Sequence, residues 1–369
     1  MGLLPLMVLS LMTAQPARAA TTWAHEQEIV YSGNVGCGAY FGGFTDRMGV
    51  SVALTLGLND SRCPRQTFSI GRPGGPYLAE QSPFANYPNR INLLGITEDS
   101  TGTWFLMQAR SGLPSDFHHN AVISVFHRDT HGKYSAVKTI GVIPVNDCTG
   151  SFGCEGSIIA SGGRWWAVYA RRTSKGMQIV QARTLGGDGG SVVTRLLPTN
   201  QYVTQVQPQL LRSSAGKMAI VLNHESSWFT DEVVVSDYAS GVWGPLHVVH
   251  RTTSQDDYQY LQDVTFAGAN LVLLIQGNNR PYQGLATRIG STWHWHLSSS
   301  SLPLDQVDAT SDGHLLVAQP IGPSFDQERV LRLDGTRYVE VGRSTTSGWL
   351  THTASGGAAY YNDKVNWDK

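Results

Sequence analysis

The sequence predicts an all-β fold, a single seven-bladed β-propeller closed by an N-terminal strand. Three observations favour it: a glycine-containing hairpin recurs seven times, apolar runs follow the turns, and the composition disfavours helices. Charged residues make up only 15% of the chain, too few for the Lys/Glu-rich faces of surface helices. The 40 glycines suit a chain with many tight turns.

The hairpin repeat gives the number of blades. A strand, a tight turn and a second apolar strand recur along the chain. The turn glycines are Gly49, Gly102, Gly163, Gly216, Gly268, Gly313 and Gly357. They lie 44 to 61 residues apart, which is room for four short strands and their loops. A pair of β-sandwiches is the alternative, but no Pro/Ser-rich linker or change of composition divides the chain.

The second strand of each hairpin is expected to lie inside the molecule, because its apolar run is continuous. Such runs are Trp104–Met107, Trp165–Tyr169, Ala219–Leu222, Leu271–Ile275 and Leu315–Ala318. Continuous apolar residues are typical of a strand buried on both faces, as between neighbouring blades. Alternating strands around a second turn follow at Val233–Trp243, Gly284–Trp293 and Val330–Tyr338. These alternating segments are predicted to be outer strands.

The N-terminus carries an export signal in this interpretation. Residues 1–19 are predicted to be a signal peptide, because Gly2–Met12 is apolar and Ala17-Arg18-Ala19 has the small-x-small pattern of a cleavage site. A basic n-region is missing, and a buried strand is the alternative. The propeller then occupies residues 20–369, and the protein is expected outside the cell or in the periplasm.

The two ends of the mature chain are predicted to meet. The last repeat ends before a fourth strand, whereas His25–Tyr31 alternates like a strand. We therefore expect this segment to complete the last blade and to remove an open edge. Arg62–Pro88, rich in Pro and Gly, is expected to be a long irregular loop.

Four cysteines suit an exported protein. Cys37, Cys63, Cys148 and Cys154 form an even set, which favours two disulfides. Proximity suggests Cys37–Cys63 and Cys148–Cys154, while the other two connectivities stay open. A zinc site is the alternative, but no C-x-x-C or histidine spacing supports it.

The charge balance excludes some partners. Without Arg18 the chain has 26 basic and 28 acidic residues, so it presents no field for nucleic acid and no polybasic membrane anchor. No later segment has the ~18 continuous apolar residues of a membrane span. A monomer is expected.

Two outer turns resemble a known motif. Asp129-Thr-His-Gly-Lys-Tyr134 and Asp237-Tyr-Ala-Ser-Gly-Val-Trp243 are similar to the Asp box, Ser-x-Asp-x-Gly-x-Thr-Trp, although their Asp–Gly spacing is longer. This box marks turns in sialidase-type β-propellers, a superfamily that also includes polysaccharide lyases such as ulvan lyases and non-catalytic glycan binders. The resemblance implies a propeller that works on glycans, and the fold alone does not choose among these activities.

Candidate site residues follow from strand order. Loops that lead into the first, innermost strand of each blade and loops that follow its second strand project to one face, here called the working face. Several of them combine a cation, an aromatic ring and a hydrogen-bonding group, which suits sugars. The catalytic candidates are His119, His224, Tyr260 and Arg280, and the substrate-binding candidates are Arg110, His118, Arg171, Glu225, Trp228, Asn278 and Tyr282.

Each candidate also has a purely structural interpretation. His118 and His119 could be a solvated loop pair, His224–Glu225 an ion pair, Arg171 part of a salt bridge and Tyr260 a packing residue. No Gly-x-Ser-x-Gly, His-Glu-x-x-His or EF-hand pattern is present. No cofactor is expected, although His118, His119 and His224 leave a divalent metal open.

Three functions remain at this stage. Lyase-type β-elimination on a uronate-containing extracellular polysaccharide needs a cation on the carboxylate and a His or Tyr as base and acid. A sialidase-like hydrolase needs an arginine cluster with a Tyr nucleophile, a Glu and an Asp; the Arg-Ile-Pro signature is absent. A non-catalytic glycan binder would have similar loops in every blade, but these loops differ in length and chemistry. We therefore place elimination first.

Overall fold

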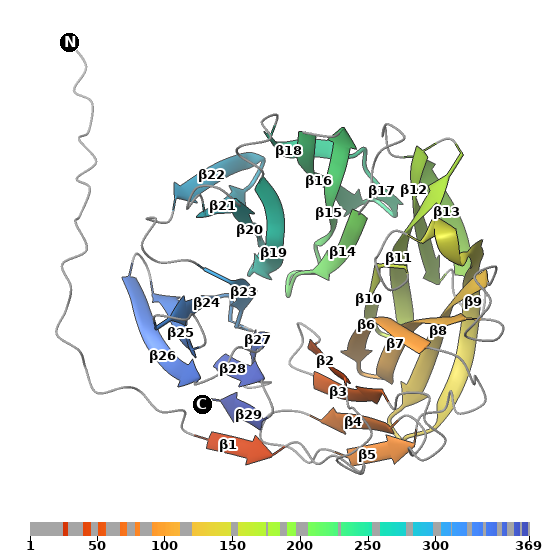
Figure 1. The fold of residues 1–369 in the computed structure, drawn as a ribbon, viewed down its shortest axis with the longest axis horizontal. Helices are drawn as coiled ribbons and strands as arrows, with labels where there is room; N and C mark the ends of the chain where they lie inside the picture. The colour runs from red at the N-terminus through yellow and green to blue at the C-terminus, as the bar shows by residue number, and fades with distance from the viewer. Residues whose placement is uncertain are drawn as a thin grey trace.

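The computed structural model is built of β-strands arranged around a central axis (Figure 1). It describes residues 25–28, 40–45, 51–56, 67–71, 78–81, 91–110, 120–148, 154–174, 176–184, 190–196, 206–227, 230–252, 259–277, 283–297, 304–310, 312–322, 327–334, 337–344, 349–352, 358–361 and 364–367. The predicted signal peptide, Cys37 and Cys63 lie outside these residues.

Seven antiparallel sheets account for the strands of the described residues, and we number them in chain order. Sheet 1 contains β2 (Tyr40–Thr45), β3 (Ser51–Leu56), β4 (Thr67–Gly71) and β5 (Leu78–Gln81). Sheet 2 contains β6 (Ile91–Asp99), β7 (Gly102–Arg110), β8 (Asn120–Asp129) and β9 (Tyr134–Pro144). Sheet 3 contains β10 (Gly156–Ser161), β11 (Arg164–Thr173), β12 (Gly176–Thr184) and β13 (Gly190–Leu196), after the short 3-10 helix η1 (Val145–Asp147).

The remaining sheets repeat this order. Sheet 4 contains β14 (Val206–Arg212), β15 (Met218–Ser227), β16 (Thr230–Ala239), β17 (Val242–Trp243) and β18 (His247–Thr252). Sheet 5 contains β19 (Gln259–Ala267), β20 (Asn270–Gly277), β21 (Gln283–Ile289) and β22 (Thr292–Leu297). Sheet 6 contains β23 (Gln306–Ala309), β24 (Leu315–Ile321), β25 (Gln327–Asp334) and β26 (Arg337–Ser344). Sheet 7 contains β27 (Trp349–His352), β28 (Ala358–Tyr361), β29 (Lys364–Trp367) and β1 (His25–Glu28).

Sheet 7 contains the pairing of the two chain ends that the sequence predicted, whereas sheet 1 differs from the prediction. In sheet 7, the N-terminal strand β1 pairs with β29, so the first and last described strands are neighbours. In sheet 1, β4 and β5 fall inside Arg62–Pro88, which we expected to be irregular. That expectation was wrong because Pro and Gly cluster between these two short strands and conceal them.

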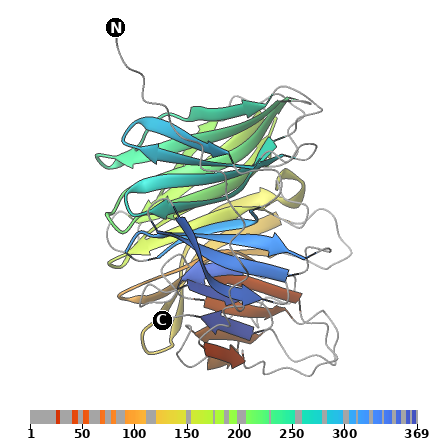
Figure 2. The same cartoon turned by 90° about the vertical axis from the view of Figure 1, so that its left-hand side faces the viewer.

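The first strands of the sheets face the central axis (Figure 1). Around the axis, β2 contacts β6, β6 contacts β10, β10 contacts β14, β14 contacts β19, β19 contacts β23, β23 contacts β27 and β27 contacts β2. In the side view, the strands run between the two faces of this arrangement (Figure 2). All-β propeller architecture is therefore the observed fold.

The second strands β11, β15, β20 and β24 pack against both neighbouring sheets, as their apolar runs predict. In β15, Met218, Ile220 and Leu222 pack toward sheet 3, whereas Ala219 and Val221 pack toward sheet 5. The same alternation divides β20, where Leu273 faces sheet 4 and Leu274 faces sheet 6. This two-sided burial follows from the two-residue period of a strand.

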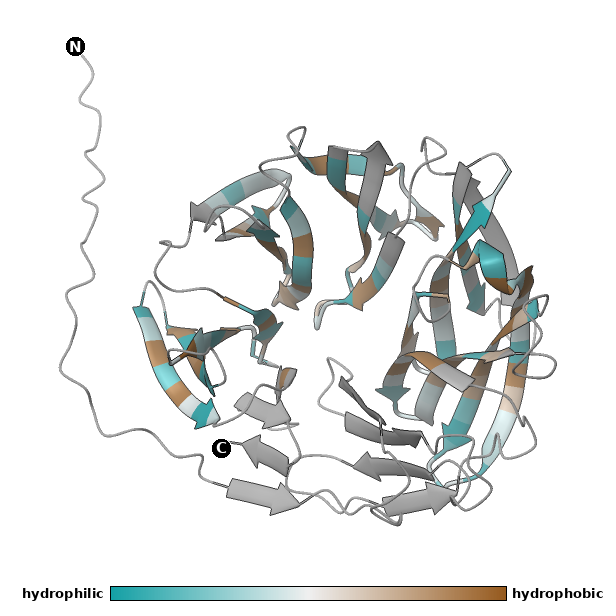
Figure 3. Ribbon diagram, in the orientation of Figure 1, coloured by the Kyte–Doolittle hydropathy of each residue, from teal (hydrophilic) through white to brown (hydrophobic). Residues whose placement is uncertain are grey.

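Outer strands are less buried and alternate in polarity. Figure 3 shows teal and brown bands alternating along β26, whose residues Arg337, Tyr338 and Val339 are exposed. One side of such a strand packs on its neighbour and the other meets water. The outer-strand prediction is confirmed by strand order for β16, β21 and β25, which are third in their sheets, and for β22, which is fourth, although residues 231–236 of β16 are buried.

The turns that join the first and second strands of neighbouring sheets meet on the face opposite the working face. The Asp99 carboxylate accepts a hydrogen bond from the Gly163 backbone N–H at 2.7 Å, which joins the turns of sheets 2 and 3. Lys217 donates to the Ala269 carbonyl at 3.3 Å, and a Cβ at Gly313 would lie 3.2 Å from Gly268. The second strands consequently all end on the other side, at the working face.

The two Asp-box-like turns use their aspartates differently. The Asp129 carboxylate accepts bonds from the His131 and Lys133 backbone N–H groups, each at 2.9 Å, and so closes its own turn. Asp237 instead receives both terminal nitrogens of Arg288 at 2.8 and 2.6 Å, which ties sheet 4 to sheet 5.

Deleting β1 tests the pairing of the two ends. A chain that begins at Ser32 lacks the partner of β29 and is expected to lose about 2–4 kcal/mol of unfolding free energy, because ladder hydrogen bonds are lost and a free edge appears. Urea unfolding of this chain is compared with that of a chain beginning at Thr21. Equal midpoints for the two chains would contradict the pairing of β1 with β29.

Asp99→Asn tests the link between sheets 2 and 3. Burial raises the pKa of Asp99, but bonds from Thr101, Gly163 and Trp104 outweigh it and leave the pKa below its usual value. The stabilisation is therefore present above the unfolded pKa of ~3.9 and is lost as pH falls through the lower folded pKa.

The variant is expected to lose about 1–3 kcal/mol at pH 7, because an amide nitrogen replaces an accepting oxygen. The loss should shrink in acid, where wild-type Asp99 is itself protonated. Asp312→Asn is the comparison variant: its aspartate also has a lowered pKa but bonds within its own turn, so the difference between the two variants measures the link between sheets. A loss that is the same at all pH values would count against the charged link.

Candidate functional site

Most sequence-predicted site residues lie outside the described side chains. His118, His119, Trp228, Asn278, Arg280 and Tyr282 fall outside the described residues altogether. The backbones of Arg110, His224 and Glu225 lie in β7 and β15, where His224 pairs with Val206 and Glu232, but their side chains are not described. Arg171 and Tyr260 are described, and their environments are built up below. The convergence of the four catalytic candidates stays a prediction.

A polar residue follows the apolar run of the second strand in each of sheets 2 to 6. These residues are Gln108 in β7, Arg171 in β11, Asn223 in β15, Gln276 in β20 and Gln319 in β24. Because the second strands end at the working face, the polar groups lie along the side of the apolar core that faces it. We call the four amides of this set, Gln108, Asn223, Gln276 and Gln319, the amide collar.

Side chains on the first and second strands also bind the backbone of the next sheet. Gln108 accepts a bond from the Cys154 backbone N–H at 2.7 Å, and Asn223 accepts one from Leu261 at 3.5 Å. On first strands, Asp263 accepts from Val307 at 2.9 Å and Gln306 accepts from Leu350 at 2.6 Å. These bonds tie the beginnings of the first strands of sheets 3, 5, 6 and 7 to the preceding sheet.

Tyr260 lies at the junction of sheets 5 and 6. Its hydroxyl donates to Gln276 Oε1 at 3.2 Å, and the neighbouring Gln262 donates to Asp305 Oδ1 at 3.2 Å. Burial raises the pKa of Tyr260, and the negative charge of Asp305 raises it further. The phenol is thus a proton donor at neutral pH, so it can act as an acid and is a poor nucleophile or base in the free protein.

A guanidinium lies on the sheet 6 side of the same junction. Arg329 Nε donates to Gln319 Oε1 at 2.6 Å, and its Nη1 lies 3.9 Å from Glu340 Oε2. Leu315, Val317 and Leu331 pack toward sheet 5, and two-residue alternation puts Gln319 and Arg329 on that side as well. The Arg329 side chain keeps 28% of its surface exposed and can meet an anion.

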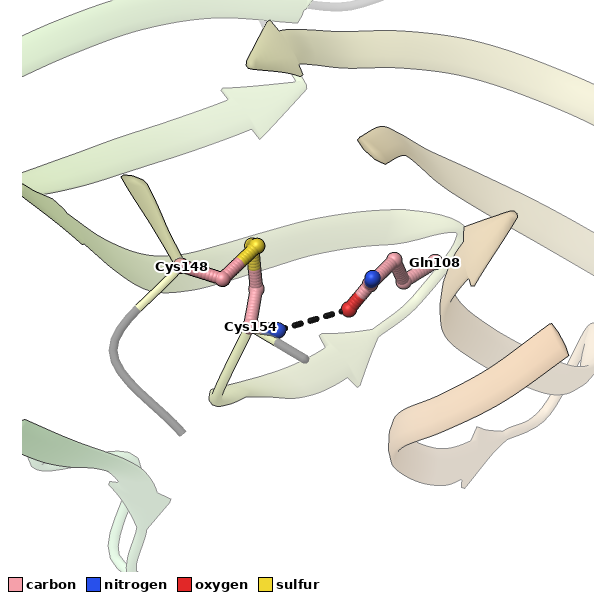
Figure 4. Close-up of a disulfide and its surroundings, with 3 residues drawn as sticks. All are labelled: Gln108, Cys148 and Cys154. Atoms are coloured by element: carbon pink, nitrogen blue, oxygen red, sulfur yellow. Dashed lines mark hydrogen bonds between the residues drawn. A yellow bond between two sulfur atoms is a disulfide. The ribbon is translucent and has the colours of Figure 1, made fainter. Parts of the chain in front are cut away.

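The predicted disulfide Cys148–Cys154 forms at the junction of sheets 2 and 3. Figure 4 shows the Gln108 amide reaching the Cys154 backbone beside the sulfurs. The Cys148 backbone also forms an isolated antiparallel β-bridge with Arg171. The Arg171 side chain donates from Nε and Nη2 to Gln178 Oε1 at 3.0 and 2.8 Å. Arg171 is therefore held by an amide, and the salt bridge considered from the sequence is not its described contact.

Sequence reasoning missed the members of this site other than Tyr260 and Arg171. Gln108, Gln276 and Gln319 each follow an apolar run directly, and that position was a signal that could have identified them. Arg329 gave no comparable signal, because it lies on an alternating outer strand.

The described part of the chain contains no candidate metal cluster and no candidate membrane-spanning helix. No group of three or more His, Cys, Asp or Glu side chains there could hold a metal ion. Among the same residues, no helix has the length and apolar character to cross a membrane. The side chains of His118, His119 and His224 do not belong to the described part.

Comparison with known proteins gives distant structural likenesses. No family model and no curated protein sequence matches the chain. A Hadza microbial sialidase is 12% identical, with 84% of this chain and 72% of that chain covered and a TM-score of 0.49. An Aleuria aurantia lectin bound to alpha-methyl-L-fucoside is 11% identical, with 87% and 98% covered and a TM-score of 0.44. The YCF48 protein bound to a peptide is 11% identical, with 96% and 98% covered and a TM-score of 0.49. At these values the likenesses do not assign an activity.

The Cys148→Ser, Cys154→Ser double variant tests the disulfide. Opening a loop closed over a sequence separation of 6 is expected to cost about 2 kcal/mol. Urea unfolding measures the loss, and a non-reduced digest of the wild type should contain the linked peptide. Two free thiols in that digest, or unchanged stability of the variant, would overturn the bond.

Proposed function

We propose that this protein is a secreted carbohydrate-active enzyme that cleaves a uronate-containing extracellular polysaccharide by β-elimination. The observation that carries the proposal is the position of the Tyr260 phenol, whose hydroxyl donates a hydrogen bond to Gln276 at the working face. The enzyme is proposed to act as a monomer without a cofactor.

The proposed architecture is a seven-bladed propeller of residues 20–369, with residues 1–19 removed on export. Seven sheets among the described residues support the blade count. The pairing of β1 with β29 and the contact of β27 with β2 support a ring closed by the N-terminal strand. The Cys148–Cys154 bond suits an oxidising compartment.

The chemistry assigns a role to each group. A base, His119 or His224, takes the proton from the carbon next to the uronate carboxylate. The electron pair of that bond forms the carbon–carbon double bond while the glycosidic carbon–oxygen bond breaks. The departing oxygen takes the Tyr260 proton, and Arg280 with Arg329 pairs with the carboxylate to stabilise the charge that develops there.

The supporting residues are proposed to hold the polysaccharide chain. Arg110, His118, Arg171, Glu225, Trp228, Asn278 and Tyr282 are the proposed sugar contacts around this centre. A sialidase-like hydrolase with Tyr260 as nucleophile is disfavoured, because the raised pKa keeps the phenol protonated. The exposed Trp295 indole beside the His250 ring favours a non-catalytic glycan binder as the second candidate.

A substrate panel separates these functions. The secreted protein is incubated with alginate, polygalacturonate, hyaluronan, chondroitin sulfate and ulvan. Elimination yields unsaturated uronate, detected by its ultraviolet absorbance; new reducing ends without that absorbance indicate hydrolysis. Retention by a polysaccharide without any product would favour the binder, and no retention and no product would reject all three.

Tyr260→Phe tests the acid. Turnover is expected to fall ~100-fold or more with little change in KM, because the variant fills the same space without a proton to give. Tyr338→Phe, on the exposed outer strand β26, is the matched control and should keep full activity. His224→Ala should lower turnover similarly, and Arg280→Ala should mainly raise KM.

The pH profile supplies a second readout of Tyr260. Since its pKa is raised, the loss of activity caused by its deprotonation should occur above pH ~10, as pH rises through that pKa. This alkaline limb should be absent from the residual activity of Tyr260→Phe. Equal turnover of wild type and Tyr260→Phe would reject Tyr260 as the acid.

A further inference from the structure

A second cluster with sugar-binding chemistry lies on the other side of the same strand. His250 Nε2 lies 2.7 Å from Gln259 Oε1, and the Thr252 hydroxyl lies 3.5 Å from the same nitrogen. The His250 ring lies beside the Trp295 indole, with 5.3 Å between ring centroids and 52° between planes. The group therefore joins β18 of sheet 4 to β19 and β22 of sheet 5.

The Trp295 indole follows a well-packed part of β22 and is itself open to solvent. Trp293, two residues earlier on β22, packs into the core between sheets 4 and 5 and lies under Arg288, 5.6 Å from its guanidinium carbon. Arg288 in turn is clamped by Asp237 of sheet 4. Trp295 keeps 42% of its surface exposed, so an apolar ring stays available beside His250.

The polar groups beside the indole suit a hydroxyl-bearing ligand. With Gln259 Oε1 as acceptor, a neutral His250 carries its proton on Nε2 and offers Nδ1 as an acceptor. Nδ1 has no hydrogen-bond partner among the residues that the structure describes. Arg251 alongside is paired with Glu232 at 2.6 Å, so the cluster contains no unpaired cation for a carboxylate. Its chemistry matches the hydroxyls and the apolar face of a sugar ring.

The position of the cluster relates it to Tyr260. Gln259 and Tyr260 are consecutive on β19, with Cα atoms ~3.8 Å apart. Successive side chains on a strand point to opposite sides. Gln259 contacts His250 of sheet 4 and Leu261 packs toward the same sheet, so Tyr260 between them points to the sheet 6 side. A polymer that crosses the start of β19 would contact both clusters with different units.

We propose that Trp295, His250 and Gln259 form an accessory subsite that binds a sugar unit of the polysaccharide by ring stacking and hydroxyl hydrogen bonds. The inference rests on the proposed function, because it takes the same polymer as its ligand. Trp295 is a binding residue in this account and touches no reacting atom.

Affinity electrophoresis tests the subsite independently of cleavage. Wild type, Trp295→Ala and His250→Ala are run in native gels that contain polygalacturonate, alginate or hyaluronan. Tyr338→Ala, an exposed aromatic of sheet 6, is the control, and melting temperatures verify folding. Trp295→Ala should bind roughly tenfold more weakly than wild type to the polymer that retards wild type, as truncation of a binding tryptophan typically does. Tyr260→Phe should be retarded like wild type.

Equal retardation of wild type and Trp295→Ala would overturn the subsite and leave the proposed function standing. Loss of retardation in Trp295→Ala in a protein that yields no cleavage product would support the subsite and reject the enzyme. A wild type that none of the gels retards would overturn the subsite. Conversion of a dimer to a monomer by Trp295→Ala in size-exclusion chromatography would also overturn it, because a second copy would then cover the indole.

Discussion

Two-sided packing of the second strands is the constraint on which the rest of the structure depends. Leu222, Leu273, Leu274, Leu316 and Val317 are fully buried, and neighbours along each strand pack against different sheets. Burying a side chain of this kind contributes about 1.5–3 kcal/mol. Since each run serves two interfaces, the stability of one sheet depends on the sheets beside it.

The same constraint places the working face. A strand that is buried along its length ends at a defined position along the central axis, so the residue after its apolar run is held in a defined place. Gln108 and Asn223 use that position to bind the next sheet, and Gln276 uses it to hold the Tyr260 hydroxyl. The candidate site is consequently built on strands, and its precision comes from core packing.

The sequence predicted the repeating features well and the side-chain partners poorly. Apolar runs after glycine turns and the Cys148–Cys154 pair are local patterns, and both are present in the structure. The direction of Tyr260 was beyond such reasoning because β19 has a bulge between Leu261 and Asp263. Leu261 and Val264, three residues apart, therefore pack into one cluster, and alternation counted back from Val264 gives the wrong side for Tyr260. The Asp99–Gly163 link was also hidden, because its partners lie 64 residues apart.

Hydrogen exchange under native conditions tests the two-sided packing most directly. If every second strand is held by both neighbours, the core amides of β7, β11, β15, β20 and β24 should exchange with the same free energy, equal to that of global unfolding. A second strand in any one sheet that opens at a much lower free energy, while the others stay protected, would contradict the account. The sheets would then be stable separately, and core packing could not fix the height of the amide collar.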